Sequence, residues 1–580
     1  MTRKALSGMM LTPLLVGMLT SAFYIQPVKA GETVYIRADG GVDPDTAPVS
    51  SVDNVTYTFT DNIYDEIVVE RSNIVVDGSG YMLQGQGIGY GFYLDNIKNV
   101  TIKRTITKKF SIGIMLNSSS FNAVSENNIT DNWNGLNLSW SSNNTVSGND
   151  ITNNGWGVTL YSSSNNTIIT NNITKHLYAS ESTPVGVQLF LSSGNTISRN
   201  NMTNNYSGVH LYQSSFNTIS GNDMANNPYG TLDLSESFNN IISGNSITNN
   251  GQSVFLDSSS FNVVSENNIT HNSCGVELYW SSNNNIVSGN KITNNSCGFA
   301  SEGGIQVDNG RHLYLSSNNT ISGNDVTNNH IGAKLYLSVS NIIYHNNFIN
   351  NSQQVYDYSW DHPQFPLSTN SWDDGYPSGG NYWSNYNGTD VYNGLNQDQP
   401  GSDAVGDTPN VIDSNNRDCY PLMGPFNTFD AGTWNRVTYY IDVISNSTVS
   451  NFAFNVEQKL VGINVTGING TVGFCRITVP NAMLGGPYVI LVNDSPPLTL
   501  NEMSNGTFTF LYFTYRHSTK TVTIIGTHAV PEFRSALILL LLMVFSILSA
   551  VSIKKILRKP KDTTQKTILS TLAFTGDVAI

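Results

Sequence analysis

A repeat of about 22 residues fills the chain from residue 114 to residue 350. An Asn stands two residues before each of ten apolar anchors, a Val or Ile stands five before, and in nine turns a Leu stands thirteen before, while Leu278 is displaced by one. Such a period is too short for paired helices and fits one rung of a parallel β-helix, so we predict an all-β solenoid. The anchors are separated by 22, 22, 29, 22, 23, 22, 23, 34 and 22 residues: Ile129, Ile151, Ile173, Met202, Met224, Ile247, Ile269, Ile292, Val326 and Phe348.

The apolar columns are predicted to face the inside of the solenoid. One rung cannot bury them alone, but stacked rungs bury each column against its neighbours, and each buried aliphatic side chain contributes about 1.5–3 kcal/mol. The Asn column is expected to bond its own turn and the equivalent Asn residues above and below it. Its predicted role is therefore structural.

Composition and the N-terminus indicate the compartment. Of the 580 residues, 39% are hydrophobic and only 12% are charged, which suits stacked rungs better than amphipathic helices. The formal net charge of −14 argues against a nucleic-acid partner. Residues 1–30 resemble a signal peptide, with Arg3 and Lys4 before the apolar run Met9–Leu19 and a small-residue cleavage site ending at Ala30. We expect the mature chain to be extracellular.

A second apolar run, Ala536–Ile553, is eighteen residues long and uncharged, which is enough to cross a bilayer as a helix. A basic cluster follows it and predicts a cytoplasmic end, so the chain should be anchored to the cell surface by this segment. Together with Pro531, Glu532 and Phe533, the run and the cluster resemble the PEF-type sorting signal of archaeal surface proteins, which is cut and replaced by an anchor. This chain departs from that pattern by continuing to Ile580.

The remaining segments flank the repeat. Strand-like runs such as Ile67–Val69 precede it, and a segment rich in Trp, Tyr, Asp and Gly follows it, where an open solenoid end requires a cap. Alternating strands then predict a β-sandwich stalk. The predicted organisation is a signal peptide (1–30), an N-terminal cap with the first rungs (31–113), regular rungs (114–352), a C-terminal cap (353–426), the sandwich (427–528), a transmembrane anchor with its basic cluster (529–560) and a tail (561–580).

Cysteines and carboxylates give two further hypotheses. Cys274 and Cys297 each follow an anchor by five residues, so they should lie on neighbouring rungs about 4.8 Å apart. A disulfide and a simple stack of small residues at a tight corner are both open. No cofactor is required, but Asp403, Asp407 and Asp413 offer the oxygen ligands that calcium prefers. The alternative is that these aspartates form turns.

The rungs of the type VSGNDITNN, closed by NSWDDGYPSGGNYWSNY and VGDTPNVIDSNNRDCYPLMGPF, resemble the NosD-type right-handed parallel β-helix proteins of archaeal surfaces over residues 32–426. This resemblance implies the pectate-lyase-like fold, which is shared by uronan epimerases, lyases and a periplasmic accessory of copper-enzyme maturation. The chain has no match to the Asp-Pro-His signature of the epimerases or to the Arg/Asp set of the lyases. Its Met and His residues form no local cluster of soft copper ligands.

Two outward columns flank the column Leu and define a candidate ligand-binding face, because strand side chains alternate. Aromatic platforms beside carboxylates and imidazoles suit a sugar polymer, although cross-strand stacking on an ordinary wet face is the alternative. Two long steps between anchors could wall this face with loops near residues 178–184 and 299–309. The column before the Leu contains Asn137, Thr159, Gln188, His210, Asp233, Phe255, Glu277, His312 and Lys334, and the column after it contains Ser139, Tyr161, Phe190, Tyr212, Ser235, Asp257, Tyr279, Tyr314 and Tyr336.

Three functions remain open. The first is glycan binding or adhesion at the cell envelope, with Tyr161, Tyr212, Tyr279, Tyr314, Tyr336, Gln188 and Lys334 as ligand-binding residues. The second is a polysaccharide lyase, hydrolase or epimerase that uses His210 with Asp233, or Glu277 with His312, as acid and base. The third is a copper-site maturation accessory. Binding without catalysis is favoured because no catalytic signature is present.

Overall fold

The computed structural model describes residues 32–530 apart from 177–183, 303, 308–310, 315 and 363–364, and within 301–315 it describes the backbone alone. The predicted signal peptide, apolar C-terminal segment and tail lie outside the described residues. In the described ranges, no helix is long and apolar enough to cross a membrane.

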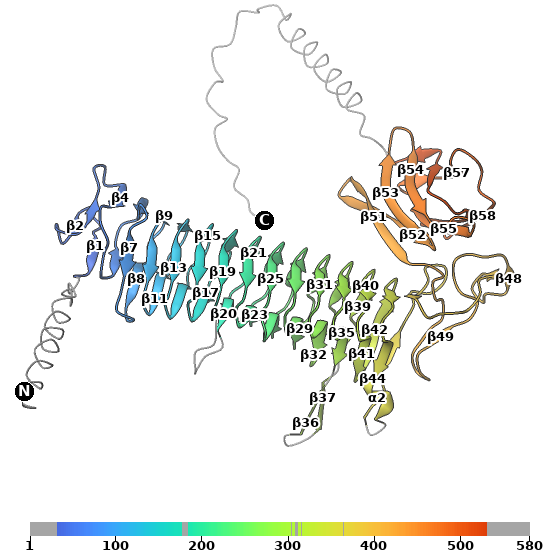
Figure 1. Cartoon of the computed structure of the whole chain (residues 1–580), viewed down its shortest axis with the longest axis horizontal. Coiled ribbons are helices and arrows are strands. Elements are labelled where there is room, and N and C mark those ends of the chain that lie inside the picture. Colours follow the sequence, from blue (N-terminus) through green and yellow to red (C-terminus); the bar gives the residue numbers. More distant parts are fainter. Residues whose placement is uncertain are drawn as a thin grey trace, which may run out of the picture.

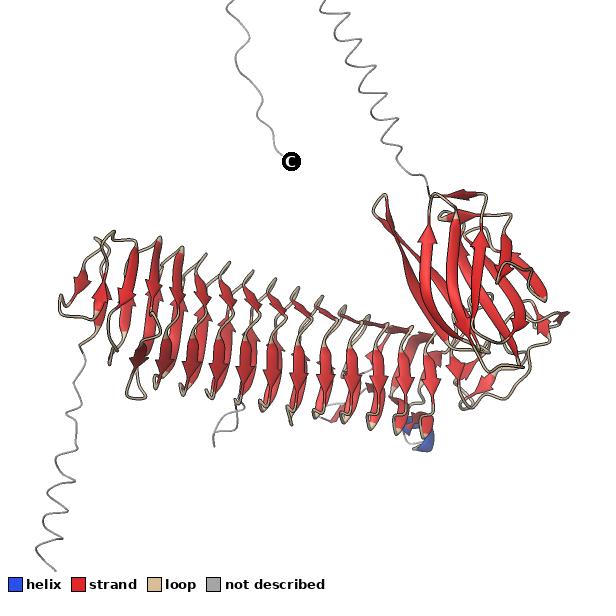
Figure 2. Cartoon of the chain, turned by 45° about the horizontal axis from the view of Figure 1, so that its top comes forward, coloured by secondary structure: helices blue, strands red, loops and turns tan. Residues whose placement is uncertain are grey.

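The chain forms a long solenoid of stacked rungs with a two-sheet domain at its C-terminal end (Figures 1 and 2). Three sheets run along the solenoid, with 15, 16 and 13 strands, here called sheets A, B and C. Sheet A carries the candidate face. Its strands, in spatial order, are β2 (Val42–Asp43), β1 (Val34–Ile36), β5 (Ile67–Val69), β8 (Tyr90–Asp95), β11 (Ile112–Asn117), β14 (Asn134–Ser139), β17 (Trp156–Tyr161), β20 (Val185–Phe190), β23 (Ser207–Tyr212), β26 (Gly230–Ser235), β29 (Gln252–Asp257), β32 (Cys274–Tyr279), β35 (Cys297–Glu302), β41 (Ile331–Tyr336) and β44 (Gln353–Asp357).

One rung shows how the repeat becomes structure. Strand β26 points Leu232 and Leu234 inward, β27 (Ile241–Ser243) of sheet B points Ile242 inward, and β28 (Ser246–Thr248) of sheet C points Ile247 inward. Each of these four side chains is 0% exposed. Parallel pairing with the next rung brings like residues into register, for example Ile247 beside Ile269. The predicted parallel β-helix and its apolar columns are therefore confirmed.

The Asn column forms a continuous ladder of amides. Asn222 donates from its backbone N and from Nδ2 to Asn245 Oδ1, both at 3.0 Å. Asn245 Nδ2 in turn donates to Asn267 Oδ1 at 2.9 Å and to the carbonyl of Ile219 at 3.0 Å. The predicted structural role of this column is confirmed, because the ladder satisfies buried polar groups at a corner where the backbone turns.

The second long step contains an inserted hairpin, and this corrects one prediction. The antiparallel strands β36 (Gly304–Val307) and β37 (Arg311–Tyr314) pair with each other and project from the lower edge of the solenoid (Figure 1). The rung itself is completed by β35, in which Ser301 lies in register with Leu335. The prediction that His312 and Tyr314 continue the two outward columns is therefore wrong. The position thirteen residues before the anchor Val326 falls inside the inserted hairpin. The sequence could not reveal this, because the hairpin strand alternates like a rung strand.

Aromatic side chains close the C-terminal end of the core. The Trp383 ring stacks on the last anchor, Phe348, with centroids 4.4 Å apart, and Trp372 packs beside both rings. The Trp383 Nε1–H donates to Asp418 Oδ2 at 2.8 Å. Trp383 belongs to the short strand β46 (Tyr382–Trp383), which pairs with β43 (Asn347–Ile349), and a four-residue helix, α2 (Tyr358–Asp361), lies at the edge of this region.

The two-sheet domain, residues 426–530, follows this cap and contains one core shared by two antiparallel sheets. Ile441, Cys475 and Leu511 of the first sheet and Val461 and Ile524 of the second are buried in it. The first sheet contains β51 (Phe426–Trp434), β52 (Val437–Ser445), β55 (Val472–Pro480), β59 (Phe508–Arg516) and β58 (Thr499–Ser504); the second contains β53 (Thr448–Asn455), β54 (Leu460–Thr466), β60 (Lys520–Ile525) and β57 (Val489–Val492), and β56 (Leu484–Gly485) pairs with β61 (His528–Ala529).

Acid is expected to stabilise the C-terminal cap. Burial raises the pKa of Asp418 to about 7, and the hydrogen bonds from Asn381 and Trp383 oppose this shift. Because the pKa of Asp418 is higher in the folded state than in the unfolded state, protonation of this carboxyl favours the folded state. The contribution, up to about 4 kcal/mol, is fully present below pH 4 and is lost as the pH rises through 7. The unfolding temperature should therefore be higher at pH 5 than at pH 8. Thermal unfolding of an Asp418→Asn variant should show a weaker pH dependence. The control is Asp223→Asn, at an exposed column position where the preceding rung holds Asn201, and it should keep the wild-type pH dependence; equal slopes for the two variants would contradict the assignment.

Candidate functional site

The outer face of sheet A, here called the sheet A face, combines the two predicted outward columns. Each central strand from β20 to β32 buries the column Leu and the Val or Leu two residues before it, and the two residues that flank the column Leu are only partly buried. The column before the Leu runs in register through Gln188, His210, Asp233, Phe255, Glu277, Ala300 and Lys334. The column after it runs through Tyr161, Phe190, Tyr212, Ser235, Asp257, Tyr279, Glu302 and Tyr336.

Four aromatic rings form a ladder at one end of this face. Trp140 meets Tyr161 edge-on at 5.5 Å, and Tyr161 stacks on Phe190 with ring centroids 5.2 Å apart and an angle of 5°. Phe190 stacks on Tyr212 at 5.2 Å. Trp140 and Tyr161 are 61% and 39% exposed, so the ladder offers its rings to a ligand as well as to each other. We call these residues the aromatic ladder.

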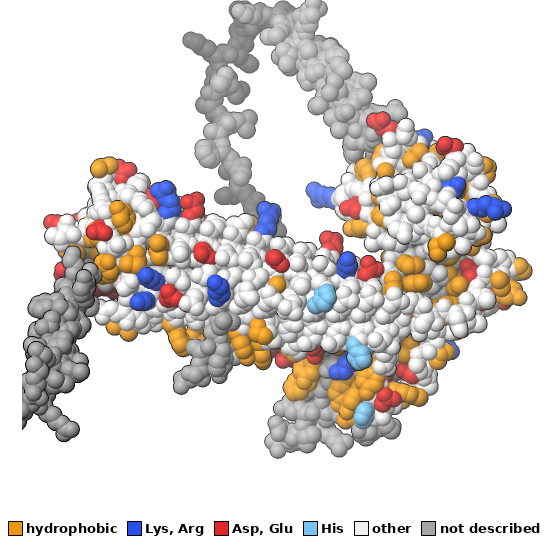
Figure 3. Space-filling model, in the orientation of Figure 1, with side chains coloured by type: hydrophobic (Ala, Val, Ile, Leu, Met, Phe, Trp, Pro, Cys, Tyr) orange, Lys and Arg blue, Asp and Glu red, His pale blue; other side chains and the backbone are white. Residues whose placement is uncertain are grey.

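A second aromatic group lies further along the same face. Tyr279 contacts Phe255 at 5.5 Å and stacks on Trp280 at 5.4 Å. Two rungs, which carry Ser235 and Asp257 in the same column, separate Tyr279 from Tyr212. Apolar side chains gather in patches along this lower edge of the solenoid (Figure 3). Tyr336 lies beyond this group and meets Tyr358 edge-on at 5.2 Å.

Three carboxyl groups lie between the aromatic ladder and the second aromatic group. Burial raises the pKa of Asp233, and the charge of His210, with Nε2 4.0 Å from Asp233 Oδ2, opposes that rise. Burial also raises the pKa of Asp257. Glu236 accepts a hydrogen bond from Gln213 Nε2 at 2.7 Å. Carboxyl oxygens at these positions can accept hydrogen bonds from ligand hydroxyls, and a carboxyl with a raised pKa can retain a proton for transfer.

One of the two predicted acid and base pairs, His210 with Asp233, lies close together in the part of the chain that the structure describes, with Nε2 and Oδ2 4.0 Å apart. His210 and Asp233 are register neighbours on β23 and β26. The register neighbour of Glu277 in the next rung is Ala300 rather than His312, because His312 belongs to the inserted hairpin. Glu277 Oε2 accepts a hydrogen bond from Gln252 Nε2 at 3.1 Å. His312 and Tyr314 are therefore not the register neighbours of Glu277 and Tyr279 in the next rung.

Sequence reasoning missed three residues at the edge of this face: Trp140, Glu236 and Trp280. Each stands two residues after the column Leu, where the backbone turns with a positive φ of 48°, 49° and 38°, respectively. Simple alternation assigns these positions to the opposite side of the strand, whereas the turn brings their side chains beside the outward column. The signal that could have found them is the recurrence of bulky or charged residues at this fixed offset.

The predicted cysteine and calcium sites take different forms in the structure. Cys274 and Cys297 lie in register on β32 and β35, as predicted, but both are thiols rather than a disulfide. Asp407 accepts hydrogen bonds from the backbone N of Val391 and of Tyr392, each at 3.0 Å. Asp413 accepts from the backbone N of Asn415 and Asn416, and Asp403 accepts from the backbone N of Val405. These aspartates therefore serve turns, and calcium binding stays a prediction.

Two family models match the chain. The model described as "Right handed beta helix region" matches residues 176–319, and the model described as "Periplasmic copper-binding protein (NosD)" matches residues 31–180 and 305–388. Together with the stacked rungs, these matches support a NosD-type right-handed β-helix. No curated protein matches the sequence.

Similar solved structures include the Dettilon tailspike protein, which is 12% identical, with 85% of this chain and 93% of that chain covered and a TM-score of 0.35. A mannuronan C-5 epimerase A-module from Azotobacter vinelandii is 14% identical, with 53% and 90% covered and a TM-score of 0.33. DFA-IIIase from Arthrobacter chlorophenolicus A6 is 10% identical, with 47% and 86% covered and a TM-score of 0.27.

The described residues do not fit a copper site. Copper in proteins is held by imidazole, thiolate or thioether ligands from several side chains that converge on one point. Among the residues that the structure describes, no three His, Cys, Asp or Glu side chains are grouped as a metal would require. Cys274 and Cys297 pack with Ala300 as a small buried cluster, and His176 and His345 each bond a backbone carbonyl.

Proposed function

We propose that this protein is an exported, membrane-anchored surface protein that binds a glycan along the sheet A face. The observation that carries the proposal is the arrangement of the aromatic ladder, the three carboxyl groups and the second aromatic group in one line along stacked rungs. Tyr212 and Tyr279 are three rungs apart, which corresponds to about 14 Å along the solenoid. The predicted signal peptide and C-terminal apolar run support export and anchoring.

The chemistry of the face suits a saccharide better than an apolar or polyanionic ligand. The exposed faces of Trp140 and Tyr161 can pack against the C–H surfaces of sugar rings. Asp257 and Glu236 can accept hydrogen bonds from the sugar hydroxyls between the two platforms. In this account the two-sheet domain is a stalk that holds the solenoid away from the membrane.

Removing one ring from each aromatic group should weaken glycan binding. Each ring is expected to contribute about 1 kcal/mol, so Tyr212→Ala with Tyr279→Ala should weaken binding about thirtyfold. A glycan array screened with the purified protein identifies the ligand, and calorimetric titration of wild type and variant measures the affinity. Phe121→Ala with Phe261→Ala is the matched control, because these rings are 63% and 56% exposed but lie outside the two outward columns. If the folded double variant keeps full affinity, the sheet A face is not the glycan site.

A carbohydrate-active enzyme is the second candidate, and the raised pKa values of Asp233 and Asp257 favour it. General acid catalysis of glycosidic bond cleavage uses a carboxyl whose pKa is raised by its surroundings. Incubation of the bound glycan with wild type and with Asp233→Asn distinguishes this function from simple binding. Product that forms with wild type and disappears with the variant would favour the enzyme; an unchanged glycan favours binding alone.

A further inference from the structure

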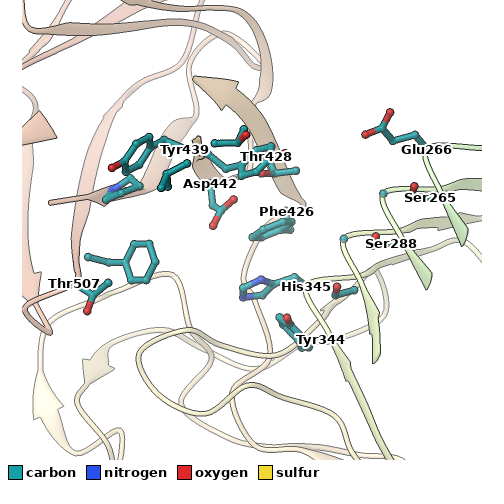
Figure 4. Close-up of a pocket in the computed structure, with 18 of the residues that line it drawn as sticks. Ser265, Glu266, Ser288, Tyr344, His345, Phe426, Thr428, Tyr439, Asp442 and Thr507 are labelled. Carbon is teal, nitrogen blue, oxygen red and sulfur yellow. The ribbon is translucent and has the colours of Figure 1, made fainter. Parts of the chain in front are cut away.

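A cavity of about 670 Å³ lies between the last rungs of the solenoid and the two-sheet domain (Figure 4). Its solenoid wall comes from sheet B, where Ser265, Ser288 and Ser322 lie in register on β30 (Val263–Ser265), β33 (Ile286–Ser288) and β39 (Thr320–Ser322). The volume falls within the range of small-molecule binding sites in proteins. None of the lining residues belongs to the sheet A face.

Two glycines in the solenoid corner leave the space for this cavity. The residues after the three serines are Glu266, Gly289 and Gly323, and the residue after Tyr344 in the next rung is His345. Gly289 and Gly323 have positive φ values of 64° and 67°, and a Cβ added at either would meet no atom closer than 3.8 Å. Glu266 and His345 therefore bound an open corner that faces the neighbouring domain.

The two-sheet domain supplies an aromatic wall at the mouth. Val437 and Tyr440 of β52 and Phe508 of β59 line the cavity and are 50%, 52% and 37% exposed. Deeper inside, the Phe426 ring stacks on His345 with centroids 4.2 Å apart. These rings provide flat apolar surfaces on two sides of a space that polar groups also line.

The polar groups of the cavity are hydroxyls and carboxylates. Nine lining side chains carry a hydroxyl, and Figure 4 shows the Asp442 carboxylate directed into the space above His345 and Tyr344. Burial raises the pKa of Asp442 to about 6, so this carboxyl is largely ionised at pH 7.5. No Lys or Arg occurs among the lining residues that the structure describes.

His345 adds no positive charge to balance the carboxylates. Burial lowers the pKa of His345 to about 4, and its Nε2 lies 3.1 Å from the carbonyl of Ser378. The ring is therefore neutral at physiological pH and donates to that carbonyl from Nε2. Among the lining residues that the structure describes, an anionic ligand would meet the carboxyl groups of Asp442 and Glu266 and no Lys or Arg, whereas the hydroxyls of a neutral ligand would meet acceptors and donors.

We propose that this interdomain cavity is a second ligand site, distinct from the sheet A face, that binds an uncharged saccharide of about two sugar residues. The sugar rings pack between Tyr440 and Phe508 at the mouth. Their hydroxyls bond to the Asp442 carboxylate and to the serine column of sheet B. Because both domains contribute, the occupied site holds the two-sheet domain against the solenoid.

The test titrates the purified full chain at pH 7.5 with cellobiose, maltose, diacetylchitobiose and digalacturonate, using saturation-transfer NMR and calorimetry. At least one neutral disaccharide should bind, and digalacturonate should not. Ala482→Trp, at an exposed lining position, should fill the mouth without disturbing the core and weaken binding at least tenfold. Asp442→Asn should also weaken it at least tenfold. Ala482→Ser is the matched control and should bind like wild type.

The outcomes separate this site from the sheet A face. Tyr212→Ala with Tyr279→Ala should leave disaccharide binding unchanged, so loss of glycan-array binding in that variant and loss of disaccharide binding in Ala482→Trp are independent results. The proposal is overturned if no neutral disaccharide binds, or if Ala482→Trp and Asp442→Asn both bind like wild type. Equal binding of digalacturonate would overturn the assigned ligand class.

Discussion

Replacing Ile247 with Asp is expected to abolish secretion of folded protein. Ile247 is 0% exposed and packs in register between Met224 and Ile269. A carboxylate at this position has no partner, so it must remain buried and charged, bind a proton or force the rungs apart, at a cost of several kcal/mol. Secreted yield and thermal unfolding of the variant measure the effect.

The matched control is Ile241→Asp, in the preceding strand of the same rung. Ile241 is 45% exposed on the outer side of sheet B, so the same change of side chain leaves the new carboxylate in water. This control should be secreted and should unfold near the wild-type temperature. A stable, well-secreted Ile247→Asp protein would contradict the inward assignment of the anchor column.

Replacing Arg476 with Met is expected to destabilise the junction between the C-terminal cap and the two-sheet domain by about 3–5 kcal/mol. Arg476 is 2% exposed, donates from Nη2 to the carbonyl of Pro377, and lies with its guanidinium carbon 4.9 Å from the centre of the Phe510 ring. Burial raises the pKa of Asp403, which is 3% exposed, and the charge of Arg476 opposes that rise. Without the arginine, the buried Asp403 carboxyl loses the positive charge that opposes the rise of its pKa.

Thermal unfolding and limited proteolysis at the junction measure this effect. The double variant Arg476→Met with Asp403→Asn should recover much of the loss, because it removes both charges together. Arg516→Met is the control, since Arg516 is exposed at the end of β59 in the same domain. A single Arg476→Met variant with wild-type stability would show that the buried charge does not hold the junction.

The fold follows from the sequence wherever one residue type recurs at a fixed offset. Ile247 and Asn245 illustrate this, because their positions in the core and in the ladder depend only on the period and on strand alternation. Leu313 shows the limit: it stands thirteen residues before its anchor, as the pattern requires, yet it belongs to the inserted hairpin β36–β37. An insertion with strand-like alternation cannot be separated from a rung by counting, because only backbone pairing distinguishes them.

The candidate sites also contain residues whose positions could be predicted from the repeat and residues whose positions could not. The pairing of His210 with Asp233 could be predicted, since both stand one residue before the column Leu on adjacent rungs. Trp140 and Trp280 could not, because their contribution depends on a backbone turn with positive φ. The interdomain cavity could not be predicted from the sequence. Ser288 and Asp442 come from separate domains, and the packing between domains produces no repeated pattern in the sequence.

The Asn ladder gives the solenoid a direction. Every rung donates from its Asn N–H and amide to the next Asn oxygen toward the C-terminus, up to Asn346, which donates to Asn381 Oδ1. The backbone N of Asn381 then donates to the Asp418 carboxyl at 2.7 Å. This end is a donor end, like the first turn of an α-helix, and an acidic side chain terminates it as one would cap a helix N-terminus. Because every interior link is the same, whole rungs can be added or removed during evolution while the chemistry of the two ends is preserved.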